Sequence, residues 1–211
     1  YNNMIEFEIL YKDKNVVVCI KPSGVSSQTD GDEKNMQDFF EKKIYCVHRL
    51  DREVSGVMVY ALNQKAAAEL SKQIQSGTFE KEYAAIVHGK PVGNEGIFED
   101  ILFKDSRKNK SFVVKRERKG TKKAKLSYKI ISSKDELTLV EIKLYTGRTH
   151  QIRVQFASRK MPLFADRKYG GKDSGNIALF SKKIKFNNIK TGEPMEFSHS
   201  LPKEFPWDIF E

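Results

Sequence analysis

The sequence predicts an α+β domain built mainly on antiparallel strands. Most apolar segments are short, β-branched or alternating, and end at turn-forming residues, whereas only two segments repeat at helical spacing. The chain has 211 residues, 39% of them hydrophobic, which is enough for one sizeable core and marginal for two. We therefore expect a single domain that spans residues 1–211.

The first strands are predicted near the N-terminus. Residues 6–11 partly alternate between apolar and polar side chains, and residues 16–20 form a short β-branched run. The turn Lys21-Pro22-Ser23-Gly24 ends that second strand. Residues 56–62 predict a third strand.

A helix is predicted to follow. Asn63 offers an N-cap, the apolar residues Ala66, Leu70 and Ile74 recur at helical spacing, and Gly77 supplies a stop.

Strands dominate the rest of the chain. We expect them at 78–88, 97–103, 112–115, 124–132, 137–144, 177–186 and 194–198. Thr149 is a candidate cap for a second helix, in which Ile152 and Phe156 lie one turn apart on the inner face.

The charge points to a polyanionic partner. The net charge is +10, and eleven basic residues against two acidic ones between Lys104 and Lys125 give that stretch a local net charge of +9. Neutralising phosphates with such residues releases counterions and drives binding to nucleic acid. A solvated, charged hairpin without a partner is the alternative interpretation of this stretch.

Several classes of protein are disfavoured. No apolar run approaches the roughly 20 residues of a membrane span, and residues 1–10 lack the layout of a signal peptide. Cys19 and Cys46 each lie in an apolar run, so we interpret them as buried, reduced thiols. No metal-binding spacing of Cys and His occurs, and we expect neither a metal nor a cofactor. We expect a cytoplasmic monomer that does not bind membranes.

Two polar clusters interrupt the apolar pattern. Asp51 lies in the group His48-Arg49-Leu50-Asp51, directly after the apolar residues 44–47, and a second cluster occupies residues 147–153. Loops held by rigid strands often carry functional sites. An aspartate next to a glycine turn is nevertheless often only a turn former, and local chemistry alone favours that interpretation.

The motifs of the chain resemble those of the RluA family of RNA pseudouridine synthases. His48-Arg49-Leu50-Asp51-Arg52-Glu53-Val54-Ser55-Gly56 is similar to the signature of that family, and Gly147–Val154 is similar to its second hallmark. Lys81-Glu82-Tyr83 followed by Val87-x-Gly89 resembles a third motif, and Lys21–Gly24 resembles the early Lys-Pro-x-Gly element. The motifs occur in family order, and the resemblance extends from about residue 9 to 205.

The resemblance implies the pseudouridine synthase catalytic fold, a bent, mainly antiparallel sheet with flanking helices and a basic cleft. It also implies roles for four residues. Asp51 matches the catalytic aspartate, which acts on the target nucleoside at the sugar C1′ or by a related route. Tyr83 matches the tyrosine beside the base, and Arg148 matches the arginine that pairs with the aspartate. Arg49 matches a residue that helps to fill the space left by the extruded base.

Four positions depart from the family pattern. Val54 replaces the usual threonine, and Gln155 stands where histidine is frequent. Phe164-Ala165-Asp166 replaces a small residue followed by Gly-Asp, and Phe180-Ser181 stands where a pair containing histidine is common. None of these departures removes Asp51, Tyr83 or Arg148.

The expected activity is isomerisation of a specific uridine in structured RNA, ribosomal or transfer. We expect no separate N-terminal RNA-binding domain, so that RNA recognition falls to the catalytic domain. The candidate RNA-binding residues are Arg49, Arg107, Lys108, Lys110, Lys115, Arg116, Lys122 and Lys123. The alternatives are a catalytically inactive RNA-binding protein on the same fold and, disfavoured by the lack of a carboxylate cluster, a metal-dependent nuclease.

Overall fold

The computed structural model describes residues 7–29, 31 and 33–210 of the chain. The chain forms two compact units. Unit 1 comprises the chain as far as Lys81 together with Phe180–Ser200, and unit 2 comprises Glu82–Leu179 and the segment from Leu201 onward. Glu6, within the first predicted strand, lies outside the described residues.

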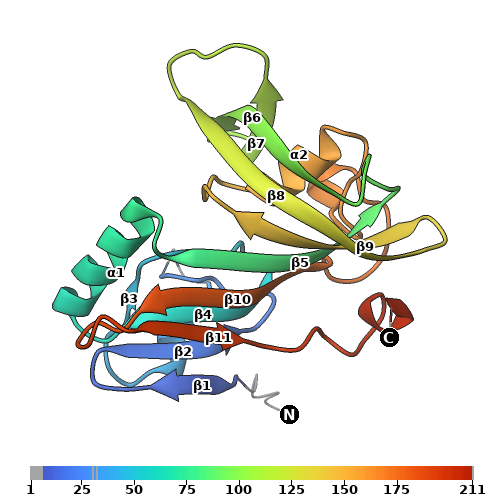
Figure 1. The fold of residues 1–211 in the computed structure, drawn as a ribbon. Helices are drawn as coiled ribbons and strands as arrows, with labels where there is room; N and C mark the ends of the chain where they lie inside the picture. The colour runs from blue at the N-terminus through green and yellow to red at the C-terminus, as the bar shows by residue number, and fades with distance from the viewer. Residues whose placement is uncertain (1–6, 30, 32, 211) are drawn as a thin grey trace. The chain divides into compact units, whose positions relative to one another are not determined.

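Unit 1 is built on a sheet that joins strands from both of its segments (Figure 1). Its strands are β1 (Ile9–Lys12), β2 (Val16–Lys21), β3 (Tyr45–Cys46), β4 (Ser55–Ala61), β10 (Leu179–Asn187) and β11 (Pro194–Ser198). The order is β1-β2-β4-β10, with β3 paired to β4 and β11 paired to β10. The β4–β10 pairing is parallel and the others are antiparallel.

Helix α1 (Gln64–Ser76) packs on this sheet, as the pattern of the sequence predicts. The side chain of Asn63 accepts the N–H of Ala66 at 2.9 Å, which caps the first turn. Gly77 ends the helix with a φ of 80°, a left-handed conformation that glycine adopts at little cost. Ala66 and Leu70 are fully buried against the sheet core. A 3-10 helix, η1 (Met36–Phe39), lies in the same unit.

Unit 2 has a second set of strands, in the order β5-β9-β8-β6-β7. They are β5 (Glu80–His88), β6 (Glu95–Asp105), β7 (Lys110–Val114), β8 (Thr121–Lys134) and β9 (Leu137–Leu144). β8 pairs antiparallel with both β6 and β9, and β7 pairs antiparallel with β6. Helix α2 (Gln151–Ala157) and the 3-10 helices η2 (Arg167–Tyr169) and η3 (Trp207–Phe210) complete the unit (Figure 1).

Aromatic rings fill the space between α2 and the strands of unit 2. The ring of Phe98 lies 4.8 Å from that of Tyr128 and 5.1 Å from that of Phe156 on α2, measured between centroids. Tilted and edge-on pairs of this kind stabilise a core beyond the area that they bury.

The α+β class and most of the predicted strands are confirmed, and one detail is wrong. The N-cap of α2 is His150, not Thr149. His150 has a left-handed backbone with a φ of 53° and makes no side-chain capping bond within the described part of the chain. The two-residue strand β3 and the short 3-10 helices were not predicted, because segments of two to four residues carry no measurable periodicity.

Candidate active site

The loop that carries Asp51 joins β3 to β4 and is fixed by buried neighbours. His48 and Leu50 are each only 7% exposed, whereas Arg49 is exposed and Asp51 is half-buried. The carbonyl of Asp51 accepts the N–H of Val54 at 3.0 Å, which closes the turn before β4. Buried and more exposed positions therefore alternate along His48–Asp51.

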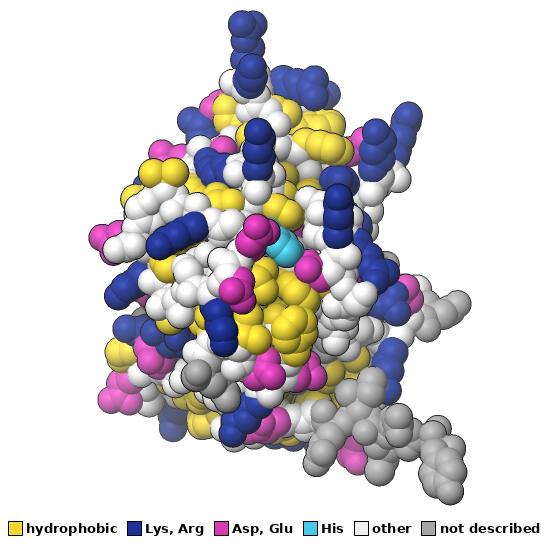
Figure 2. Space-filling view, turned by 90° about the vertical axis from the view of Figure 1, so that its right-hand side faces the viewer, with side chains coloured by type: hydrophobic (Ala, Val, Ile, Leu, Met, Phe, Trp, Pro, Cys, Tyr) yellow, Lys and Arg dark blue, Asp and Glu magenta, His cyan; other side chains and the backbone are white. Residues whose placement is uncertain are grey.

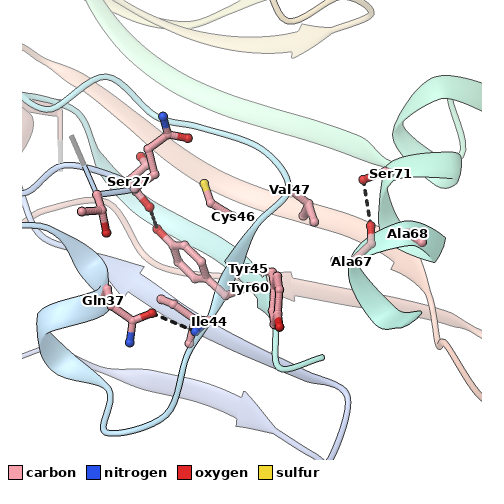
Figure 3. Close-up of a pocket in the computed structure, with 12 residues that line it drawn as sticks. Ser27, Gln37, Ile44, Tyr45, Cys46, Val47, Tyr60, Ala67, Ala68 and Ser71 are labelled. Carbon is pink, nitrogen blue, oxygen red and sulfur yellow. Dashed lines mark hydrogen bonds between the residues drawn. The ribbon is translucent and has the colours of Figure 1, made fainter. Parts of the chain in front are cut away.

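The hydroxyl of Ser27 holds the residue that precedes Asp51. Its Oγ donates to the carbonyl of Leu50 at 2.7 Å and accepts the N–H of Leu50 at 3.0 Å. Ser27 is 5% exposed, and its own carbonyl accepts the Tyr60 hydroxyl at 2.9 Å (Figure 3). Both backbone groups of Leu50 are thus satisfied by one buried side chain.

Lys21 lies beneath the same loop. Its ammonium donates to the carbonyls of Pro22 at 2.8 Å, Val25 at 2.7 Å and Arg52 at 3.1 Å, and the residue is fully buried. Burial lowers the pKa of Lys21 to about 7, and the negative charge of Asp51 acts in the opposite direction. The lysine therefore ties the early Lys-Pro-Ser-Gly turn to the Asp51 loop.

Backbone and side-chain bonds extend this junction. The carbonyl of Arg52 accepts the N–H of Gly24 at 2.9 Å, and the Arg52 guanidinium donates to the carbonyl of Gly24 at 3.1 Å. The Ser23 hydroxyl donates to the carbonyl of Glu53 at 2.8 Å. Two of the sequence motifs, separated by some thirty residues, consequently form one local structure in unit 1.

His48 serves this structure as a neutral ring. Its Nε2 accepts the N–H of Val59 at 3.2 Å, and its ring lies 5.1 Å from that of Phe79. Burial, with a smaller contribution from the charge of Lys81, lowers the pKa of His48 to about 3. The imidazole is therefore uncharged at neutral pH.

Unit 2 carries the other two predicted catalytic residues. Tyr83 lies on β5 and is 5% exposed. Arg148 precedes α2, is half-buried, and donates through Nε to the carbonyl of Lys123 at 2.9 Å. The structure thus places Asp51 and Arg49 on one loop of unit 1, and Tyr83 and Arg148 on unit 2.

Gln151 organises the turn around Arg148. Its Oε1 accepts the N–H of Arg148 at 3.0 Å and the Thr146 hydroxyl at 2.7 Å, while its Nε2 donates to the carbonyl of Lys125 at 3.1 Å. Gln151 is 3% exposed. Its position within the Gly147–Val154 motif was visible in the sequence, but its positioning role was not predicted.

The same motif anchors a buried ion pair. Arg153 binds Asp166 through two bonds of 2.8 and 2.7 Å, and both side chains are almost fully buried. His150 Nδ1 lies 2.9 Å from the Tyr169 hydroxyl, which accepts the N–H of Ser111 at 2.8 Å. Removing one partner of a buried, bidentate pair leaves an uncompensated charge in the core. Arg153 and His150 therefore have structural roles in unit 2.

Ala165, next to this ion pair, has a φ of 57°. This left-handed conformation is unfavourable for alanine and favourable for glycine. The departure from the usual Gly at this position therefore stores backbone strain beside Asp166.

The predicted RNA-binding residues of unit 2 follow β6, β7 and β8 and their connections. Arg107, Lys108, Lys115, Arg116, Lys122 and Lys123 are exposed, and Lys110 is half-buried. Figure 2 shows Lys and Arg side chains projecting at the top of its view, the end at which Figure 1 draws the β6 to β8 connections. Their arrangement presents a positively charged surface, which we call the basic surface (residues 104–125).

Other features of the described chain bear on partners and ligands. Cys19 is a buried free thiol and Cys46 a half-buried one. Among residues 7–29, 31 and 33–210, no group of three or more His, Cys, Asp or Glu side chains is placed to hold a metal ion. None of the described helices is long and apolar enough to cross a membrane.

Sequence comparison identifies related proteins. A profile of the RNA pseudouridylate synthase family matches residues 15–158. An uncharacterized RNA pseudouridine synthase of Mycoplasma genitalium, MG209, is 32% identical over 212 residues, which cover 95% of this chain and 68% of that protein. Ribosomal large subunit pseudouridine synthase C of Buchnera aphidicola is 32% identical over 223 residues, covering 97% of this chain and 70% of the relative.

Structural comparison gives the same fold. Human RNA pseudouridylate synthase domain containing 4 matches with a TM-score of 0.78 at 22% identity, covering 96% of this chain and 90% of that one. Human RNA pseudouridylate synthase domain containing 1 matches with a TM-score of 0.77 at 19% identity, covering 97% and 93%. The predicted pseudouridine synthase fold is therefore confirmed.

Proposed function

Because the chain belongs to the RNA pseudouridylate synthase family, we propose that it isomerises a specific uridine of ribosomal or transfer RNA, with Asp51 as the catalytic carboxylate. The family and the names of its relatives identify an RNA-modifying isomerase. The assignment of Asp51 rests on the fixed conformation of its loop. A half-buried carboxylate follows a residue whose two backbone groups are held by Ser27, above the buried ammonium of Lys21.

Isomerisation of uridine requires few chemical groups beyond a positioned carboxylate. The enzyme breaks the N–C glycosidic bond of uridine, turns the base, and forms a C–C bond to the same sugar, so that no atom is gained or lost. An ionised carboxylate can attack the sugar C1′ or act by a related route. The fixed backbone around Asp51 supports this role because a positioned nucleophile avoids an entropic cost at the moment of reaction.

We assign the remaining roles from the motifs. Arg148 stabilises the negative charge of the aspartate in the enzyme–RNA complex. Tyr83 stacks on the uracil, and its hydroxyl assists removal of the proton from C5. A uridine within a helix must be extruded at a cost of a few kcal/mol, and Arg49, exposed beside Asp51, offsets part of that cost by filling the gap.

The basic surface supports RNA binding in our proposal. Phosphate contacts position an RNA without selecting a base. Relatives named ribosomal large subunit pseudouridine synthase C and D support ribosomal RNA as one substrate class. We propose that the protein acts as a monomer in the cytoplasm, where it meets that RNA.

The decisive experiment maps pseudouridines in RNA from cells that lack the protein, after incubation with the wild type, Asp51→Ala or Asp51→Asn. We expect pseudouridine formation with the wild type alone, while the RNA affinity of both variants stays within a few-fold of the wild type. Unchanged turnover in Asp51→Asn would overturn the assignment of Asp51. RNA binding without any product from the wild type would favour the alternative, an inactive RNA-binding protein.

A further inference from the structure

Two phenylalanines form a pair on the outer face of the β6–β7 ribbon in unit 2. Phe103 of β6 and Phe112 of β7 are direct register partners. Directly opposed residues of an antiparallel pair place their side chains on the same face of the sheet, close enough to contact each other. Phe112 is 36% exposed and Phe103 is half-buried. We call these two residues the aromatic pair.

A cation lies over each ring of the aromatic pair. The Lys110 ammonium is 5.8 Å from the ring centroid of Phe112, and the central guanidinium carbon of Arg118 is 4.9 Å from that of Phe103. Lys110 also lies 4.9 Å from the ring centroid of Tyr169. Cations at these distances interact favourably with the negative faces of aromatic rings. A positive charge from β7 and another from the β7–β8 connection therefore lie beside the pair.

The acidic residues of this region are already engaged. Asp105 accepts the N–H groups of Arg107 at 3.0 Å and Lys108 at 3.2 Å, and so stabilises the turn between β6 and β7. Glu117 forms an ion pair of 3.1 Å with Lys123. The surroundings of the aromatic pair consequently remain strongly positive and complement a polyanion.

We propose that an unpaired base of the RNA substrate stacks on Phe112, while phosphates on either side of that base contact Lys110 and Arg118. Aromatic side chains interleaved with cations are the arrangement that binds single-stranded nucleic acid, because every base has a flat face to stack. A surface that contacts only a duplex backbone needs the cations and not the rings. The inference rests on the proposed function and adds a substrate class to it, an RNA with a single-stranded segment beside its stem.

The test measures binding of the full chain to two probes, a single-stranded oligouridine that carries a fluorescent purine analogue and a blunt RNA duplex of equal length. Phe112→Leu keeps an apolar residue but removes the π face, and Phe112→Tyr keeps the face. Ile97→Ala serves as the control because Ile97 is an exposed apolar residue of the neighbouring strand β6, at 59% exposure. Salt titrations accompany each measurement.

We expect Phe112→Leu to weaken single-strand binding about fivefold or more without changing its salt slope, since stacking releases no counterions. Duplex binding should change less than twofold, and Phe112→Tyr and Ile97→Ala should resemble the wild type. Single-strand affinity in Phe112→Leu equal to that of Ile97→Ala would overturn the proposal, as would equal losses for both probes.

Uridine isomerisation by the wild type, measured in parallel, separates the two proposals. If the wild type forms pseudouridine and Phe112→Leu binds the single strand normally, only the stacking role fails. If the wild type forms none, the proposed function fails whatever the outcome at Phe112.

Discussion

The hydroxyl of Ser27 binds both backbone groups of Leu50, donating to its carbonyl at 2.7 Å and accepting its N–H at 3.0 Å. The two residues are 23 positions apart in the sequence and both are buried. A loop fixed in this way loses little entropy when its next residue, Asp51, must hold one orientation. Ser27 therefore acts on the proposed carboxylate through the backbone and is a positioning residue.

Ser27→Ala should reduce both kcat and the free energy of unfolding. Loss of a hydroxyl that pairs two buried backbone groups costs about 1–3 kcal/mol of unfolding free energy. We expect a fall in kcat of about tenfold, with KM for RNA nearly unchanged, because the loop loses its fixed orientation. Ser181→Ala is a matched control, since the buried Ser181 hydroxyl donates to the carbonyl of Val57 at 2.9 Å. Equal kcat values in the two variants would refute the positioning role of Ser27.

His48 should make the unfolding free energy fall in acid. Its pKa is lowered from 6.5 to about 3, so between these values the unfolded chain binds a proton that the folded chain does not. The unfolding free energy then decreases as the pH falls below 6.5, by up to about 1.4 kcal/mol per pH unit. His48→Gln keeps an acceptor for Val59 and removes this titration. Denaturant unfolding between about pH 4 and pH 7 should give a shallower dependence for the variant, and identical slopes would contradict the prediction.

Neutralising the basic surface should reduce the salt dependence of RNA binding. The triple variant Lys108→Gln, Lys115→Gln and Lys122→Gln should lower the slope of log K against log salt by about 2, as fewer counterions are released. The control changes three exposed lysines of unit 1 to glutamine, and its slope should match that of the wild type. These control positions are Lys65, Lys185 and Lys190. An unchanged slope in the first triple variant would remove the RNA-binding role of those lysines.

Ala165→Gly should stabilise the protein, by about 0.5 kcal/mol. Relief of the left-handed strain at a φ of 57° is worth about 1–2 kcal/mol, and the greater freedom of glycine in the unfolded chain removes part of it. Ala67→Gly within α1 is the control, and should cost about 1 kcal/mol. Thermal or denaturant unfolding compares the two, and a loss of stability in Ala165→Gly as large as that in Ala67→Gly would show that the site is unstrained.

Local patterns of the sequence predicted much of this fold. Asn63 and Gly77 bound α1 because capping and stop signals act within a few residues of the helix. Thr149 failed as a cap because the chain continues to a left-handed His150 before the helix begins, and no local preference foretells that conformation.

The support of the candidate site was harder to foresee. Lys21, in a turn motif, would ordinarily remain solvated, yet three carbonyls and the Asp51 loop enclose it. Ser27 binds Leu50, and Gln151 binds the backbone of Arg148. Both sets of hydrogen bonds depend on which backbone groups the fold brings together. The periodicity of a sequence carries no information on such long-range contacts. The sequence therefore identified Asp51, Tyr83 and Arg148 as candidates, but not the residues that hold the loops of Asp51 and Arg148.

The parallel pairing of β4 with β10 has a consequence for folding of the chain during its synthesis. Ser55 and Gly56 pair with Phe180 and Ser181, which the ribosome makes only after the whole of Glu82–Leu179. Throughout that interval the nascent chain carries the residues of β4 without their β10 partners, and an open strand edge invites association with other chains. We therefore expect the yield of correctly folded protein to depend on how soon translation delivers residues 180–200.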